Sequence, residues 1–244
     1  MSEASATPRN SNKFIGLDGC SGGWVASLYD AHTNDIQLSF FEKLKAGKDL
    51  YSAAETVWID MPIGLSGDGI TRTIDYTMRI HLRWRKSSVF FPPSYEALSK
   101  SVYEEANRIN KLIYGKGLSK QAWNLRKKIL ELFDFLQTNP ILLEKFKESH
   151  PELVFQSEWP REYPLSSKNL HLGYVQRIQV IGKYIPDIQE KVEKFCREYP
   201  TTILKKHDVL DAVILSVKAA CGSTNELTQQ PDHDKFGLPF LVVY

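Results

Sequence analysis

The sequence predicts a mixed α/β fold, in which one sheet of parallel and antiparallel strands is covered by helices on both faces. Short apolar segments with strand-like alternation dominate residues 13–60, and longer segments with helical spacing of apolar side chains fill most of the rest. The composition is that of a globular protein, because 42% of the 244 residues are hydrophobic and 25% are charged.

Four strands and one short helix are expected before residue 61. The strands cover Lys13–Asp18, Trp24–Tyr29, Asp35–Phe41 and Thr56–Asp60, and the helix covers Leu44–Ala54. Gly19–Gly23 predicts a tight turn because glycine adopts positive φ angles readily, so the first three strands form an antiparallel meander. Pro62 ends the fourth strand because proline cannot continue the hydrogen-bond ladder.

Helical patterns dominate from about residue 66 to residue 149, which predicts a long helical insertion. They cover Thr71–Lys86, Ser94–Tyr114 and Ser119–Gln137. A strand is expected at His150–Phe155, helices at Ser166–Tyr184, Pro186–Tyr199 and His207–Ala220, and a last strand at Gly237–Tyr244. No linker divides the chain, so residues 13–244 are expected to form one domain after a disordered tail of residues 1–12.

The net charge and the cysteines indicate which classes of partner and which cell compartment to expect. With 31 Lys and Arg against 29 Asp and Glu, a generally basic surface is excluded, although a local basic patch is not. Three cysteines far apart suit free thiols in a cytoplasmic protein. No apolar run is long enough to span a bilayer, and the first 12 residues do not resemble a signal peptide. We therefore expect a cytoplasmic protein with no membrane partner.

Asp18 and Asp60 each end an apolar strand and precede a glycine or proline turn. Active sites of α/β sheets gather at that edge. Either residue alone could equally be a turn or capping aspartate, but two of them favour a functional site.

Asp208 and Asp211 lie three positions apart, so they share one face of the expected helix. Asp211 lies among apolar residues, where burial of a carboxylate costs several kcal/mol unless a cation or strong donors compensate. Metal binding or catalysis is therefore predicted for Asp211. Asp208 could equally be a first-turn residue favoured by the helix dipole. Glu152 in His150-Pro-Glu152 is a further candidate, with a solvated acid as the alternative.

Carboxylates that cluster repel one another and have raised pKa values unless a divalent ion keeps them ionised. Ligation by oxygen alone favours Mg²⁺ or Mn²⁺, and no Cys/His spacing in the chain is typical of a zinc site.

Four ordered motifs carry a resemblance to a known family: Gly16–Trp24, Trp58–Leu65, His150–Glu152 and Asp208–Ala212. The chain resembles, from Lys13 to Tyr244, an uncharacterised conserved family, a domain of unknown function described as a predicted RNase H-like nuclease. The resemblance implies an RNase H-like fold, with a mixed five-stranded sheet flanked by helices and interrupted by the long insertion.

The resemblance also implies roles for particular residues. Asp18 would come from the first strand and Asp60 from the fourth. Asp208 and Asp211 would come from the last helix, in an arrangement similar to that of RuvC-type junction resolvases. Glu152 would lie near the same edge. A partly kept Lys-Lys-Thr-like element, followed by Gly and Arg, makes Lys168 and Arg177 candidates for binding a phosphate.

The expected function is metal-dependent hydrolysis of phosphodiester bonds in a nucleic acid. Asp18 would bridge two Mg²⁺ or Mn²⁺ ions, and Asp60, Asp211 and either Asp208 or Glu152 would complete their ligands. The basic side chains of the insertion could hold the phosphate backbone. The alternative is that they form a solvated helix face. These side chains are Arg79, Arg83, Arg85 and Lys86. Trp84 could stack on a base, although aromatic residues more often pack in a core.

Two other classes stay open. A nucleotide-binding phosphotransferase of the actin and sugar-kinase type also begins with a strand, an aspartate and a glycine turn, but it needs two phosphate loops and this chain has one. A catalytically idle RNase H-like module that binds nucleic acid or protein suits the near-zero net charge. Such a module has no need of Asp211 in an apolar helix.

Overall fold

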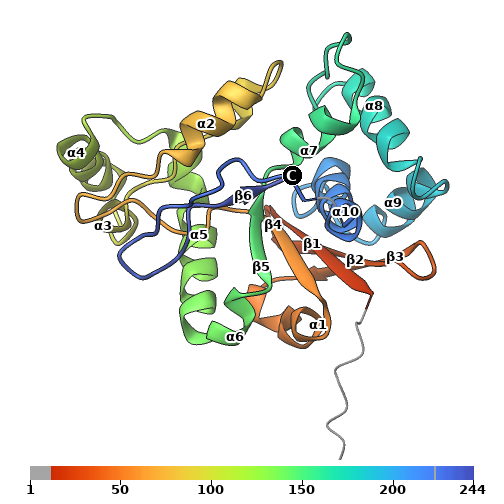
Figure 1. Cartoon of the computed structure of the whole chain (residues 1–244), viewed down its shortest axis with the longest axis horizontal. Coiled ribbons are helices and arrows are strands. Elements are labelled where there is room, and N and C mark those ends of the chain that lie inside the picture. Colours follow the sequence, from red (N-terminus) through yellow and green to blue (C-terminus); the bar gives the residue numbers. More distant parts are fainter. Residues whose placement is uncertain (1–11, 223) are drawn as a thin grey trace, which may run out of the picture.

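The computed structural model describes residues 12–222 and 224–244, which form an α/β structure around one six-stranded mixed sheet (Figure 1). The strands are β1 (Lys13–Cys20), β2 (Gly23–Asp30), β3 (Asp35–Phe41), β4 (Thr56–Asp60), β5 (Phe146–Ser149) and β6 (Val242–Val243). Their order in the sheet is β3-β2-β1-β4-β5-β6. The first three strands are antiparallel neighbours, and β1, β4, β5 and β6 run parallel.

The α/β prediction is confirmed, and the sheet has six strands where the family resemblance implies five. The last strand expected at Gly237–Tyr244 is present but shorter, as the two-residue β6. Of the predicted tail, residues 1–11 lie outside the described part of the chain. No helix in residues 12–222 and 224–244 combines the length and the apolar character that crossing a membrane requires.

Helices cover both faces of the sheet (Figure 1). One face packs against α7 (Pro151–Glu158), α8 (His171–Ile181), α9 (Ile188–Cys196) and α10 (Lys206–Ala220). The other face packs against η1 (Leu44–Gly47), α1 (Lys48–Ala53), α5 (Lys120–Thr138) and α6 (Pro140–Leu143). The helix predicted at His207–Ala220 is confirmed as α10, and the one at Ser119–Gln137 as α5.

Alternation along β1 decides which side chains face which layer. Ile15 and Leu17 are fully buried in the core beneath α5, so Gly16 and Asp18 lie on the opposite face, towards α10. In β4 the same alternation places Val57 and Ile59 beneath α5, while Trp58 belongs to the core around α10. Asp60, two residues after Trp58, therefore shares a face with Asp18.

Gly16 allows α10 to lie directly on β1. A Cβ atom built on Gly16 would lie 1.9 Å from the carbonyl oxygen of Ala212 and 2.6 Å from the amide nitrogen of Ser216. A buried hydrogen bond of 2.9 Å between the hydroxyls of Ser27 and Ser216 holds the same helix to β2. The absence of a side chain at Gly16 thus sets the depth at which α10 sits on the sheet.

The predicted insertion is largely confirmed as helical. Between β4 and β5 the chain forms α2 (Ile74–His81), η2 (Lys86–Ser88), α3 (Tyr95–Leu98), α4 (Tyr103–Tyr114), α5 and α6. Figure 1 shows α2, α3 and α4 to one side of the sheet. The single helix expected over Thr71–Lys86 is shorter, and the one over Ser94–Tyr114 is split in two.

The strand predicted at His150–Phe155 is wrong, because this segment begins α7. The fifth strand is the preceding Phe146–Ser149, which the sequence pattern assigned to the insertion. Pro151 occupies the first turn of α7, where its missing N–H is not needed. The ring nitrogen Nδ1 of His150 accepts a hydrogen bond of 3.2 Å from the backbone of Glu152 and caps the helix.

Replacing Gly16 by alanine is expected to destabilise the protein by about 3 kcal/mol, because the new methyl group would overlap the backbone of α10. Chemical denaturation measured by circular dichroism tests this. Gly117→Ala is the control, since a Cβ there would meet only the side chains of Asn107 and Lys111. Equal stability of the two variants would contradict direct packing of α10 on β1.

Candidate metal centre

Three aspartates from distant parts of the chain meet where the parallel pairing of β1 and β4 ends. In the parallel pairing of these strands Asp18 stands directly beside Asp60. Asp211 reaches the same place from α10, and each of the three offers an oxygen within 4.8 Å of the others. Asp18 and Asp211 are buried, while Asp60 is half-buried. We call these residues the acidic triad.

Burial and mutual repulsion dominate the electrostatics of the acidic triad. Burial raises the pKa of Asp18 well above its usual range, and the charges of Asp60 and Asp211 raise it further. Burial raises the pKa of Asp60 to about 7, although the ammonium of Lys168 opposes the shift. Without a further cation the three side chains are therefore not all stably ionised near neutral pH.

Lys168 provides the cation that contacts the acidic triad. Its Nζ donates to Oδ2 of Asp211 at 2.5 Å. Burial alone would lower the pKa of Lys168, but Asp211, Asp18 and Asp60 together raise it above its usual range. Lys168 is therefore a charged ammonium, and 30% of its side chain remains exposed.

Asp208 lies one helical turn before Asp211 and caps α10. Its Oδ2 accepts a hydrogen bond of 3.1 Å from the backbone of Lys205, and its Oδ1 lies 3.3 Å from Nε2 of His207. Burial raises the pKa of Asp208, and His207 opposes this. Asp208 is outside the acidic triad but close enough for its charge to raise the pKa of Asp60.

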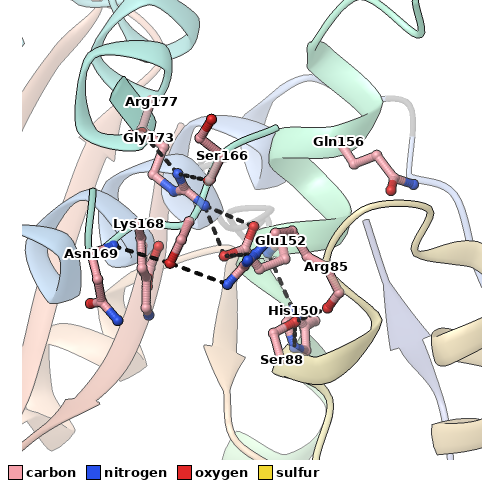
Figure 2. A network of polar contacts seen from close by, with 12 residues as sticks. Arg85, Ser88, His150, Glu152, Gln156, Ser166, Lys168, Asn169, Gly173 and Arg177 are labelled. Atoms are coloured by element: carbon pink, nitrogen blue, oxygen red, sulfur yellow. Dashed lines mark hydrogen bonds and ion pairs between the residues drawn. The ribbon is translucent and has the colours of Figure 1, made fainter. Parts of the chain in front are cut away.

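Glu152 and Arg177 form a separate buried ion pair, shown in Figure 2. Nη2 of Arg177 donates to both carboxylate oxygens of Glu152 at 2.8 Å. Nη1 of Arg177 donates to the carbonyl oxygens of Ser166 at 3.1 Å and Gly173 at 2.8 Å. Arg177 is fully buried. Glu152 and Arg177 are therefore ion-pair partners. Arg177 is not accessible to a phosphate, although the family motif makes it a candidate for binding one.

The three arginines of the insertion that were predicted to bind substrate lie in different settings. Arg79 donates to the carbonyl oxygen of Val89 at 2.8 Å and stacks on Phe91. Nε of Arg85 lies 3.8 Å from Oε1 of Glu152, and its Nη2 donates to the hydroxyl of Ser167 at 3.4 Å. Only Arg83 of the three is exposed.

Arg83 lines a pocket of about 170 Å³ between the loop after α2 and the end of α7. Its walls include a second arginine and several aromatic side chains, among them Arg161, Trp84, Trp159 and Tyr163. Trp84 and Tyr163 are 50% and 63% exposed. Gln156 fixes the loop, because its side chain accepts from the backbone of Arg83 at 2.6 Å and donates to the carbonyl oxygen of His81 at 2.8 Å.

The contacts of two cations were not predicted, and one of them, Lys128, lies close enough to the acidic triad for its pKa to respond to the charge of Asp18. Lys128 on α5 donates to the carbonyl oxygen of Gly23 at 2.5 Å, beside the β1–β2 turn. Arg72 is buried against Asp75 and Glu148 and also donates to the carbonyl oxygen of Ile63 at 2.7 Å. The contacts of Lys128 with Gly23 and of Arg72 with Glu148 form only through the tertiary fold, so no local sequence pattern marks them.

Comparison with known proteins places the chain in a family. The family described as protein of unknown function (DUF429) matches residues 16–235, which include all the predicted site residues. No curated protein and no solved structure matches the chain.

Asp60→Asn is expected to stabilise the metal-free protein above about pH 7. The pKa of Asp60 is higher in the folded state, at about 7, than the ordinary value of 3.8, so the folded state binds more protons between these values. Stability is then lost as the pH rises through this window. We expect a gain of about 1–2 kcal/mol, or about 2–8 °C in Tm, in thermal unfolding with a chelator at about pH 8.

The gain should vanish at about pH 4, where Asp60 is protonated in the wild type. Asp134→Asn is the control, because Asp134 is exposed on α5. A destabilised Asp60→Asn protein at about pH 8 would contradict the repulsion inferred for the acidic triad.

Proposed function

The chain belongs to the DUF429 family of proteins of unknown function, and we propose that it is a metal-dependent nuclease that hydrolyses phosphodiester bonds. The observation that carries the proposal is the acidic triad. Asp18 and Asp60 stand side by side at the carboxyl ends of parallel strands, and Asp211 completes a set of oxygens within 4.8 Å of one another. Sheet edges of this kind are where α/β proteins bind ligands.

The acidic triad suits a hard divalent cation. All three side chains offer carboxylate oxygens, which favour Mg²⁺ or Mn²⁺ over zinc. Lys168 supplies one positive charge against as many as three negative ones, so the site keeps an excess of negative charge that a divalent ion would balance. Asp18, Asp60 and Asp211 would hold the ion.

When bound, such an ion lowers the pKa of an attacking water and stabilises the leaving oxygen of the substrate. The chain's own residues prepare the rest of the reaction. The buried setting of Asp18 and Asp211 excludes bulk water and strengthens electrostatic interactions at the site. The exposed part of Lys168 offers an ammonium to a phosphoryl oxygen.

The resemblance to a predicted RNase H-like nuclease supports a nucleic acid as the substrate. The pocket around Arg83 supports the same substrate class, since an exposed Trp84 can stack on a base and arginines can pair with phosphate. At about 170 Å³ the pocket is smaller than the ~300–1,000 Å³ of drug-sized ligand sites and suits a single ring system. Free thiols at Cys20, Cys196 and Cys221 accord with the cytoplasmic location that we also propose.

The phosphotransferase alternative is disfavoured by the β1–β2 turn. The backbone N–H of Gly22 donates to the carbonyl oxygen of Ile203 at 3.0 Å, so it is not available to a phosphate. A Cβ at Gly23 would lie 2.1 Å from the carbonyl oxygen of Phe41, so Gly23 is needed for packing. An idle module is favoured by one observation, the partial neutralisation of Asp211 by Lys168.

Asp18→Asn and Asp211→Asn are each expected to lower Mg²⁺- or Mn²⁺-dependent cleavage by at least about 100-fold, because loss of one ligand removes several kcal/mol of transition-state stabilisation. The substrates are single-stranded, duplex, hybrid and junction nucleic acids. Asp134→Asn is the matched control. Cleavage that survives both triad substitutions would place the activity elsewhere, and no cleavage by the wild type would favour the idle module.

Trp84→Ala is expected to weaken binding of a fluorescent single-stranded oligonucleotide by about 5- to 100-fold, because a stacked base contributes ~1–3 kcal/mol. Arg83→Ala should weaken binding and also lower its salt dependence. Fluorescence anisotropy in chelator measures both. Arg108→Ala, at an exposed site on α4, is the control, and equal losses in all three variants would rule out a specific role for the pocket.

A further inference from the structure

The loop that carries Lys168 is held by hydrogen bonds and close packing on its N-terminal side. Gln176 accepts a hydrogen bond of 2.8 Å from the backbone of Ser166, while Arg177 donates to the carbonyl oxygen of the same residue at 3.1 Å. A Cβ at Gly173 would lie 2.0 Å from the carbonyl oxygen of Ser167, so α8 touches the loop backbone directly. Figure 2 shows this arrangement, in which Glu152 fixes Arg177 and Arg177 fixes the loop.

The held loop directs Lys168 at the acidic triad. Its ammonium contacts Oδ2 of Asp211, and the pKa values of Asp18 and Asp60 both respond to its charge. A surface lysine that happens to meet an acid has no such support and contributes little. The buried ion pair of Glu152 and Arg177 therefore helps to place the Lys168 ammonium against the triad, although neither Glu152 nor Arg177 belongs to the triad.

From this geometry we infer that Lys168 is a built-in cation of the acidic triad, so that the site binds one divalent ion and the ammonium takes the place of a second. This rests on the proposed metal-dependent function. Three carboxylates carry at most three negative charges, and one ammonium with one divalent ion balances them. A second divalent ion would leave an excess of positive charge and would lie close to the ammonium.

Glu152 and Arg177 are positioning residues in this arrangement. They act through the loop that they hold and do not touch the acidic triad. Lys168 lies in the loop between α7 and α8. Glu152 on α7 binds Arg177 on α8, and Arg177 in turn holds this loop.

The test is a count of bound Mn²⁺ ions on the full chain, by equilibrium dialysis and by the loss of the EPR signal of free Mn²⁺. The wild type should bind one ion per chain. Lys168→Gln should bind two, because the second position is no longer occupied by the ammonium. Lys168→Arg keeps the charge and should bind one. Circular dichroism checks that each variant is folded.

Two further variants make the count specific. Lys218→Gln removes a different lysine–carboxylate pair, the 2.7 Å contact with Glu158, and should bind one ion as the wild type does. Asp211→Asn should lose the ion. Two ions in the wild type, or one in Lys168→Gln, would overturn the role of Lys168 and leave the metal centre intact. No Mn²⁺ binding by the wild type would overturn the metal centre itself.

Discussion

The contact between Gly16 and α10 is the constraint on which the site depends. It brings the backbone of a helix against the backbone of a strand, with no side chain between them. Ala212, whose carbonyl oxygen faces Gly16, is the neighbour of Asp211, so the depth of this contact sets the height of Asp211 above the sheet. The parallel pairing of β1 and β4 then sets the spacing of Asp18 and Asp60. One close approach and one strand register are enough to assemble the acidic triad.

Two of the buried charge clusters of this protein differ in their balance of acids and cations. Glu152 is fully balanced, because Arg177 donates to it through two hydrogen bonds of 2.8 Å and Arg85 lies 3.8 Å away, and such a cluster stabilises the structure. The acidic triad is unbalanced, because its carboxylates outnumber the one ammonium that contacts them. Repulsion within such an unbalanced buried cluster destabilises the metal-free fold.

Much of the fold and the triad was predictable from local sequence signals. Glycine turns and strand alternation mark β1, β2 and β4, and the apolar setting of Asp211 marks a buried carboxylate on α10. β5 was missed because its four residues include Lys147 and Glu148, which do not look buried in isolation. Glu148 is stabilised there by Arg72, a partner 76 positions away. Glu152 and Arg177 pair with each other across 25 positions of the sequence. Their spacing does not reveal that Glu152 binds an arginine instead of a metal ion, or that Arg177 binds a carboxylate instead of a phosphate.

The distance along the chain between Asp18 and Asp211 has a consequence for synthesis. The strands β1, β2 and β3 are synthesised well before α10, the helix that packs on their buried face and completes the triad. Until α10 is made, the face of the sheet that includes Val25 and Trp58 lacks its main covering helix, which exposes apolar surface of the nascent chain to aggregation. The same order means that an incomplete chain carries only two of the three acids. The acidic triad is thus complete only after α10 has been made and has packed on β1.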